Sequence, residues 1–505
     1  RDENGGWANC SQPTPGYENS EQGYEQYLSA AKEDGADIRI TELMASNLSC
    51  IQDADGDFSD WIELTNYGAK TASLKGYFLS DREDNLSKWT LPDVSLQPGE
   101  RIVIFASGKD ETAGGELHTN FSLNHHAGMV ALSASNGQIV SSANYSELGD
   151  NVSLAADEIT GEWRSTTDPT PGYSNDETGY ESFENAQKTG ASLIISEAMT
   201  GNVTLLKQGR NGCFDWVELQ NRSNEPIELG QFTLTDNLSK TERCALPDQT
   251  LAPGGCIVLL CTGDTPLTKS DYAQVALSLG SSIEELYLLD ESGAVADYLT
   301  LSGIPVGASC GRTPGQNGRF YYADPSPGEE NEGGYRLISS APSASAEQGV
   351  YPNVSSLTIA LSAQGDIYYT TNGDTPTVKS KKYAGPITIT QTTVVRAACV
   401  SEGKMISAPV TLNYFLNTEH MLPIISVTTD EANLYDDEIG ILASRNLFDR
   451  SVECPANVSF FSDSGCFSVE CGLKLHGAGS RGKLAKKSYK IVFRAKYGQS
   501  ELNFP

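Results

Sequence analysis

The residues with the clearest chemical potential lie near the C-terminal end, where cations gather around a glycine-rich segment. Residues 471–500 hold eight Lys and Arg side chains and no Asp or Glu, although the whole chain carries a formal charge of −31. The segment HGAGSRG (476–482) could bring backbone N–H groups close to an anion. Lys490, on the strand that follows, could act as a point charge. We predict phosphate contacts by Ser480, Arg481 and Lys490; a solvated basic hairpin is the alternative.

An acidic motif, DADGDFSD, is the second group of residues that could bind a ligand. Its carboxylates stand around one glycine, at Asp53, Asp55, Asp57 and Asp60. Oxygen ligands at this spacing suit calcium, although the motif lacks the bidentate Glu that closes an EF-hand loop. The related segment KQGRNGCFD (207–215) retains one of the four carboxylates. An acidic turn before a strand is the preferred interpretation, and calcium binding is the alternative.

Histidine and cysteine give weaker signals. His125 and His126 would point to opposite faces of a strand, which argues against a metal shared with His118. None of the eleven cysteines forms a CxxC pair, so the usual zinc spacing is absent. Two groups of cysteines leave either a disulfide or buried free thiols open: Cys213, Cys244, Cys256 and Cys261, and then Cys454, Cys466 and Cys471.

Length and charge limit the class of protein. A chain of 505 residues is too long for one core and fits about three to five domains. The strongly negative charge argues against nucleic-acid binding, which needs a basic surface. No run of 18 apolar residues predicts a membrane span. We also expect sequence upstream of Arg1, which is not a natural first residue.

The elements that would position these residues come from an internal repeat with an offset of 155 residues. IRITELMASN (38–47) corresponds to LIISEAMTGN (193–202), and DWIELTNYG (60–68) corresponds to DWVELQNRS (215–223). The strings WIELTN and WVELQN alternate apolar and polar residues, as half-buried strands do. We therefore predict two β-sandwiches in which the tryptophans of WIELTN and WVELQN are equivalent and buried.

A closing element recurs with the repeat. DPTPGYSNDETGYESF (168–183) and DPSPGEENEGGY (324–335) end the two copies, and QPTPGYENSEQGYEQY (12–27) is a third occurrence. We therefore expect residues 1–30 to be the tail of a truncated upstream repeat. They hold too few apolar residues to offset the chain entropy of forming a core. A short acidic helix is also expected in GYESFENAQKTG, between the two copies.

The ordered elements ITELMASN, DWIELTN, LKGYFLSD and LPDVSLQPGERIVIFASG resemble the lamin tail domain as it occurs in bacterial secreted proteins. The resemblance covers 38–173 and 193–328. It places one domain at 31–187 and a second at 188–335. It implies Ig-like sandwiches used for attachment or spacing, without catalytic residues.

The segment 336–417 has a different pattern, with at least four alternating strands joined by turns such as TNGDTP. It resembles the small sandwich at the C-terminal end of chitobiases and hexosaminidases, where it is an accessory module. Tyr368, Tyr369 and Tyr383 could form a sugar-stacking face. Packing within the sandwich is the more common role of such tyrosines.

The segment 418–505 changes pattern again. LPIISVTTD, GLKLHGAGSR and KKSYKIVF, in this order, resemble the start of the spore-coat (CotH) kinase domain, a family of atypical protein kinases. The resemblance implies ATP with Mg or Mn as cofactors of the intact protein. Kinase chemistry also needs carboxylates that hold the metal, and only Glu501 follows position 471. We therefore expect no catalytic residue in this chain and place the acids beyond Pro505.

The predicted fold class is mostly β: tandem Ig-like β-sandwiches followed by an incomplete α+β kinase-like segment. The predicted function is that of an extracellular or cell-surface modular protein, with spacer or adhesion modules in front of a truncated kinase-like domain. Its partner would be a surface protein or a polysaccharide. The two alternatives are a protein kinase of surface or coat proteins in the intact protein, and a carbohydrate-binding surface protein.

Overall fold

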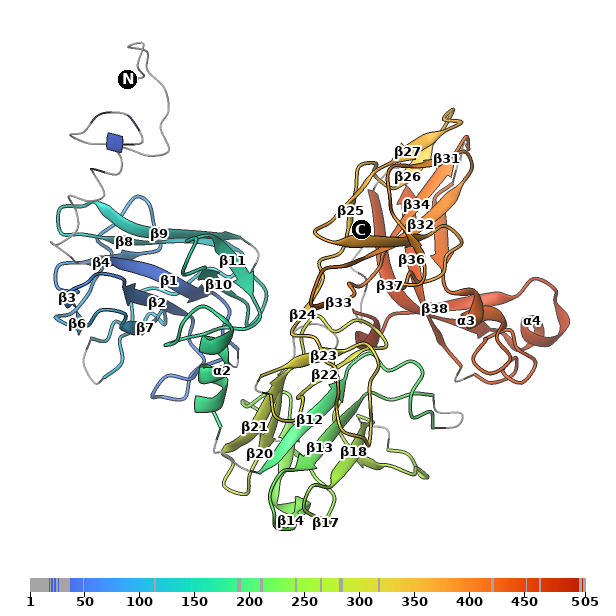
Figure 1. Ribbon diagram of the computed structural model, residues 1–505, viewed down its shortest axis with the longest axis horizontal. Helices are drawn as coiled ribbons and strands as arrows, with labels where there is room; N and C mark the ends of the chain where they lie inside the picture. Colours follow the sequence, from blue (N-terminus) through green and yellow to red (C-terminus); the bar gives the residue numbers. More distant parts are fainter. Residues whose placement is uncertain are drawn as a thin grey trace. The chain divides into compact units, whose positions relative to one another are not determined.

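The computed structural model describes residues 37–498 with short gaps, and isolated positions nearer the two ends at 18, 20, 22, 23, 26 and 502. The gaps are at 49, 113–114, 147, 189–191, 209–211, 241–242, 264–265, 281–284, 317, 419–421, 451 and 463–464. Strands dominate and the described helices are short, so the predicted mostly-β class is confirmed (Figure 1). The closing element predicted at 12–27 and the tail predicted at 1–30 lie outside the described residues, single positions excepted.

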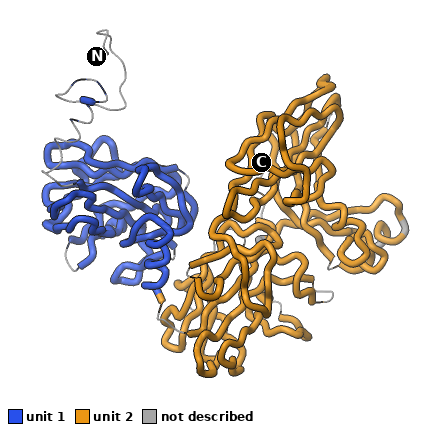
Figure 2. The backbone as a smooth tube through the Cα atoms, in the orientation of Figure 1, with its two compact units in different colours: residues 1–187 blue, residues 188–505 orange. Residues whose placement is uncertain are grey.

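The chain divides between Gln187 and Lys188 into two compact units. Figure 2 shows unit 1 in blue and unit 2 in orange. Unit 1 contains the first repeat. Unit 2 contains the second repeat and all that follows it.

Unit 1 is a sandwich of two antiparallel sheets. The first has the order β11-β10-β1-β2-β7, formed by Trp163–Thr166, Ser153–Ala156, Ile38–Met44, Trp61–Asn66 and Arg101–Phe105. The second has the order β5-β4-β8-β9, formed by Trp89–Thr90, Phe78–Ser80, Ala127–Ser133 and Ile139–Ser146. The short strands β3 (Ala72–Ser73) and β6 (Ser95–Leu96) form a separate pair.

The acidic helix predicted after the first repeat is present as α2 (Glu177–Ala186). It begins after Asp176, whose side chain accepts a hydrogen bond from the backbone N–H of Gly179 at 2.8 Å. Such an N-cap satisfies one of the backbone donors that the first turn of a helix leaves without a partner. Tyr180 and Phe183 form the buried side of the helix.

The second repeat, in unit 2, has the same plan. One sheet has the order β19-β18-β13-β12-β22-β23, formed by Ala273–Val275, Cys256–Cys261, Trp216–Asn221, Leu193–Met199, Ser309–Gly311 and Phe320–Tyr322. The other has the order β16-β15-β20-β21, formed by Cys244–Ala245, Thr233–Thr235, Glu285–Leu289 and Val295–Thr300. Strands β14 (Ile227–Glu228) and β17 (Thr250–Leu251) pair beside a 3-10 helix, η2 (Leu229–Gln231).

Strand register confirms the offset of 155 residues. Glu42 lies opposite Glu63 in the first repeat, and Glu197 lies opposite Glu218 in the second. The first strand of each repeat has its register shift at the same place, immediately before the glutamate. The tryptophans are equivalent and fully buried, as predicted: Trp61 and Trp216.

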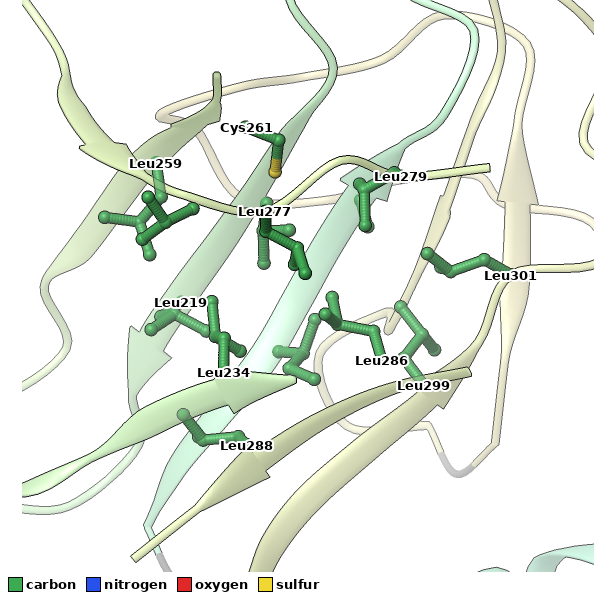
Figure 3. Packing of buried hydrophobic residues seen from close by; sticks show 14 of the residues in the cluster. Leu219, Leu234, Leu259, Cys261, Leu277, Leu279, Leu286, Leu288, Leu299 and Leu301 are labelled. Carbon is green, nitrogen blue, oxygen red and sulfur yellow. The ribbon is translucent and has the colours of Figure 1, made fainter. Parts of the chain in front are cut away.

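Leucines fill the core of the second repeat, as Figure 3 shows. Leu219 and Leu259 come from one sheet, and Leu234, Leu286 and Leu288 come from the other. Alternating strand residues point to the same face, so each sheet presents a continuous apolar layer to its partner. This burial supplies the main stabilising free energy of the sandwich.

The third module follows the second repeat directly. Its main sheet has the order β26-β34-β32-β29-β30, formed by Gly349–Tyr351, Val410–Leu416, Thr393–Val400, Asp366–Thr370 and Lys381–Lys382. Three short pairs accompany it: β25 (Ser343–Ala344) with β28 (Leu361–Ser362), β27 (Leu357–Ile359) with β31 (Ile387–Ile389), and β24 (Leu337–Ile338) with β33 (Lys404–Met405). Met405 is buried in the core of the second repeat, which joins the two modules.

The C-terminal segment forms an antiparallel sheet of the order β35-β36-β37-β38, from Ile424–Thr428, Cys454–Ser462, Gly465–His476 and Ser488–Val492. The helices α3 (Glu431–Tyr435) and α4 (Ala478–Lys483) and the 3-10 helix η3 (Ala495–Tyr497) complete it. The apolar cluster around Cys454, Val458 and Leu473 forms the small core of this segment.

Polar bonds fix the C-terminal sheet to the third module. Thr375, in the predicted TNGDTP turn, donates its backbone N–H to the Asp430 carboxylate at 2.6 Å. The buried Arg396 guanidinium also contacts Asp430, at 3.2 Å. The side-chain amide of Asn413 donates to the Ser459 hydroxyl at 3.0 Å. These bonds come from several strands at once, so they restrain rotation between the two sheets.

Candidate functional site

The predicted basic hairpin is present as strands β37 and β38. Lys474 lies directly opposite Lys490 in the strand register. Leu473 and Leu475 are buried on the other face of β37, as the alternating pattern predicts. The glycine-rich segment between the strands is not an open loop, because residues 478–483 form the short helix α4.

Two of the three predicted phosphate contacts are engaged in structural hydrogen bonds. The Arg481 guanidinium is buried and donates to the backbone carbonyls of Leu475 and of Asp449, the latter at 3.0 Å. The Ser480 hydroxyl donates to the carbonyls of His476 and, at 3.1 Å, Gly477. These side chains hold the ends of the hairpin together. Of the three residues predicted to contact phosphate, Lys490 alone is exposed.

One buried carboxylate, that of Glu453, pairs with two cations of the basic cluster. Glu453 is largely buried and lies 3.0 Å from Arg494 Nε and 3.6 Å from Lys474 Nζ. Tyr497 donates its hydroxyl to Glu453 at 3.1 Å, and burial together with this carboxylate raises the pKa of Tyr497. A Cβ at Gly472 would be 2.6 Å from the Glu453 carboxylate, so only glycine fits there. Glu453 therefore supplies a negative charge to the basic hairpin from within the protein.

Cysteine chemistry is suppressed in the same sheet. Cys454, Cys466 and Cys471 are free thiols, so the disulfide left open for this group does not form. Burial raises the pKa of Cys454 and of Cys471 to about 12. A thiol is nucleophilic only as the thiolate. These two buried cysteines therefore act as small apolar core residues.

The acidic motif brings together three of its four aspartates. Asp53, Asp55 and Asp57 have carboxylate oxygens within 4.8 Å of one another. The ammonium of Lys109 lies among them, at 2.7 Å from Asp53, 2.7 Å from Asp55 and 3.0 Å from Asp57. Asp60 lies apart from this group and accepts the backbone N–H of Asn47 at 3.3 Å. The three carboxylates fit a cation chemically, and a side chain of the same repeat provides one.

The histidines and tyrosines correct two expectations. His125 and His126 precede β8 in a bend, and their ring centroids are 3.8 Å apart, so the opposite-face argument was wrong. Tyr369 is buried in the core of the third module and meets Tyr383 edge-to-face at 6.4 Å. Tyr383 accepts the backbone N–H of Leu361 through its hydroxyl. A three-tyrosine sugar face is therefore wrong, because Tyr369 and Tyr383 pack inside the sandwich.

Sequence reasoning missed a pair of buried glutamates in each repeat. In the first, Glu42 accepts hydrogen bonds from the Ser153 hydroxyl and from the backbone N–H and hydroxyl of Thr170. Its neighbour Glu63 accepts the backbone N–H of Gly172 at 2.7 Å. Thr170 and Gly172 belong to the closing element DPTPGYSN. We call this arrangement the glutamate latch.

The second repeat forms the same latch. Glu197 accepts the Ser309 hydroxyl and the backbone N–H of Ser326, and Glu218 accepts the backbone N–H of Gly328 at 2.6 Å. Ser326 and Gly328 belong to the element DPSPGEEN. The recurring letters T/S-P-G and the spacing of the two glutamates were visible in the sequence. Only the strand register shows that they meet.

Burial changes the proton affinity of the latch. It raises the pKa of Glu42 to about 7, against the hydrogen bonds from Ser153 and Thr170 that lower it. It raises the pKa of Glu63 to about 8, with a further increase from the charge of Glu42. The guanidinium of Arg101, 3.6 Å from Glu63, lowers both values without offsetting the burial. Two facing buried carboxylates cannot both be charged at low cost.

Comparison with known proteins supports two of the predicted modules. The family model of the lamin tail domain matches residues 31–147, and that of the chitobiase/beta-hexosaminidase C-terminal domain matches residues 346–411. No curated protein matches the chain. Among solved structures, a biofilm-associated protein BSP domain is 9% identical, over 79% of this chain and 71% of that chain, with a TM-score of 0.12.

These findings define a modular β-domain protein. Two of its parts are similar to known accessory modules, and the matched ranges end before the C-terminal sheet. Among the helices that the structure describes, none combines the length and the apolar character needed to cross a membrane.

Proposed function

We propose that this chain is an extracellular or cell-surface protein in which the β-sandwiches act as spacer and adhesion modules. The domain order would be 31–187, 188–335, 336–417 and 418–505, with a tail of a further repeat at 1–30. The partner would be a surface protein or a polysaccharide.

The glutamate latch is the observation that carries this proposal. In each repeat the closing element is bonded to the two central strands of one sheet, through Glu42 and Glu63 or through Glu197 and Glu218. The chain therefore leaves each sandwich from a fixed position. A spacer needs this property, because its length depends on where each module begins and ends.

Immunolabelling of intact cells that express the full gene tests the location. Antibodies raised against unit 1 should label the cells without permeabilisation, and mild external protease should remove the signal. Beads coated with the purified chain should also adhere to such cells. Beads coated with heat-unfolded chain are the control. Labelling that requires permeabilisation would contradict the proposal.

The match to a chitobiase/beta-hexosaminidase C-terminal domain favours carbohydrate binding as a second candidate function. Tyr368 is the tyrosine of the predicted face that is not part of the buried core of the module. A glycan array with the whole chain tests this function, and Tyr368→Ala should weaken any signal. Tyr369→Ala would instead unfold the module, because Tyr369 is buried.

A kinase role of the intact protein remains a proposal, supported by the exposed Lys490 opposite Lys474. For this chain we expect weak, salt-sensitive ATP binding without phosphoryl transfer, with Mg or Mn present. The assay uses labelled ATP, a generic acceptor protein and the Lys490→Ala variant. The exposed Lys379 offers a matched control, Lys379→Ala. Transfer above background that Lys490→Ala abolishes would show that the catalytic acids lie within this chain.

A further inference from the structure

A cavity of about 460 Å³ lies within unit 2, where the second repeat meets the C-terminal sheet. Its walls include residues of the segments 203–207 and 212–215 of the repeat and the residues around the start of β36. Pockets of about 300–1,000 Å³ typically hold small organic ligands. The spacer function proposed above does not require this space.

Positive charge dominates the cavity. Four cationic side chains line it, and two carboxylates accompany them, Asp215 and Glu453. Glu453 pairs with Lys474 and Arg494, and Asp215 accepts the backbone N–H of Asn202 at 2.9 Å. Among the described residues, the other two cations have no carboxylate within ion-pair distance: Lys207 and Lys496. The ammonium of Lys496 lies 5.1 Å from the ring of its neighbour Tyr497.

These two lysines act on one place in the cavity. Lys207 comes from the second repeat, and Lys496 comes from η3 of the C-terminal segment. The Cys213 thiol lies within reach of both charges: burial raises its pKa, the ammonium groups of Lys496 and Lys207 act against this increase, and the Asp215 carboxylate adds to it. The two parts also touch here, since a Cβ at Gly201 would be 3.3 Å from the Lys496 carbonyl oxygen.

We propose that this cavity binds a sugar-sized phosphate monoester. A phosphate monoester carries about −1.5 to −2 charges at pH 7, which matches the two ammonium groups better than a singly charged carboxylate or sulfate monoester does. Thr204, Ser278 and Asn433 are among the polar residues that also line the cavity. Such groups can bond the hydroxyls of a sugar.

A ligand in this position would contact both walls at once. It would bind only when the second repeat and the C-terminal sheet are docked, so binding would stabilise their docking. This proposal rests on the cavity and its charges, and it stands or falls independently of the surface location and of the kinase role.

Isothermal titration calorimetry of the whole chain tests the proposal, with glucose 6-phosphate as the probe. The comparison ligands are inorganic phosphate, glucose and glucuronate. Glucose 6-phosphate should bind most tightly, and its affinity should fall as salt is raised from 10 to about 150 mM, a range over which the Debye length falls from about 30 to about 8 Å. Lys207→Ala and Lys496→Ala should each weaken binding about tenfold.

The matched control is Lys379→Ala, since Lys379 is exposed and does not line the cavity. Its affinity should equal that of the native chain. Lys207→Arg keeps the charge and should retain most of the affinity. An unchanged urea midpoint of the ligand-free variants shows that they are folded.

Three results would overturn the proposal. These are no measurable heat with glucose 6-phosphate, equal affinity for inorganic phosphate, and an equal loss in Lys379→Ala. Unchanged affinity in the Lys207→Ala/Lys496→Ala double variant would overturn it as well.

Discussion

The loops that precede the central strand of each repeat follow one path and carry opposite charge. In the first repeat the Asp53 N–H bonds to the Asp57 carbonyl at 2.9 Å, and in the second the Gln208 N–H bonds to the Gly212 carbonyl at 2.8 Å. An asparagine supports each loop from within. Asn47 donates to the Ser59 carbonyl at 2.8 Å. The equivalent residue of the second repeat, Asn202, donates to the Phe214 carbonyl at 2.7 Å.

The charges on this shared path differ. The first loop holds three aspartates that are neutralised by Lys109 of the same repeat. The second holds Lys207 and Cys213, and it lines the cavity beside the C-terminal sheet. Backbone hydrogen bonds and an asparagine thus fix the loop, while its charged side chains are free to vary. The conserved hydrogen bonds explain why both loops are stable, and the charged side chains are where the two repeats differ.

The largest expected effect concerns the sandwich core that the two repeats share. Trp61→Ala and Trp216→Ala should each destabilise their own repeat by about 3–5 kcal/mol, because each leaves a cavity in a close-packed core. The measurement is urea unfolding followed by pulse proteolysis, with peptides assigned to unit 1 or unit 2. Trp61→Ala should shift the midpoint of unit 1 alone.

Trp61→Phe and Trp216→Phe provide the control for this comparison. Neither indole N–H has a hydrogen-bond partner among the described residues, so phenylalanine removes volume without breaking a bond. The phenylalanine variants should lose less than half as much stability as the alanine variants. Equal losses in both types of variant would contradict the cavity explanation.

The strands and buried tryptophans of the two repeats were predictable from the sequence, because they depend on local patterns. The alternation in WIELTN and WVELQN and the shared offset placed Trp61 and Trp216 at equivalent buried positions, and the structure confirms both. The acidic helix after the first repeat was also predictable, since Asp176 is a favourable N-cap.

The polar sites were less predictable because their partners are far apart in the chain. Glu453 is the residue immediately before β36, yet it forms ion pairs with Arg494 and Lys474 of the hairpin. Counting charges only after position 471 left this carboxylate out. Arg481 was expected at an anion, but it binds the backbone carbonyls of Asp449 and Leu475. Such contacts depend on tertiary packing, which a local motif does not contain.

The glutamate latch gives the next effect in size, through pH. The pKa of Glu63 is about 8 in the folded repeat and starts from 4.5, so the folded state binds this proton more tightly than the unfolded chain does. The stabilisation is therefore complete below about pH 4.5 and is lost as the pH rises through 8. We expect unit 1 to lose on the order of 1–3 kcal/mol between pH 5 and pH 9.

Glu63→Gln should reduce this pH dependence, because the amide keeps an acceptor for Gly172 and does not titrate, while Glu42, with a pKa raised to about 7, still titrates. Glu218→Gln should have a smaller effect on unit 2. Burial raises the pKa of Glu218 and its hydrogen bonds with Ser196 and Gly328 lower it, whereas the pKa of Glu63 is raised further by the charge of Glu42. Pulse proteolysis at pH 5, 7 and 9 measures both variants. A steep pH dependence that persists in Glu63→Gln would locate its cause elsewhere.

The smallest effect concerns the loop in which the repeats differ. Lys109→Ala removes the ammonium that lies within 3.0 Å of three carboxylates. Hydrogen bonds to Asp53 and Asp55 raise the pKa of Lys109, so this ammonium is charged at neutral pH. Ion pairs near the surface contribute little, and the Tm of unit 1 should fall by only about 1–3 °C.

The same variant tests calcium binding directly. Without Lys109, the oxygens of Asp53, Asp55 and Asp57 remain close together and repel one another, so 1 mM calcium should raise the Tm of Lys109→Ala more than that of the native chain. Lys75→Ala, which breaks an exposed pair with Asp93 at 2.9 Å, is the matched control and should not respond. Magnesium should give a smaller increase, because it requires a stricter octahedral geometry. A calcium response in the native chain would show that the metal displaces Lys109, and no response in Lys109→Ala would rule out the calcium site.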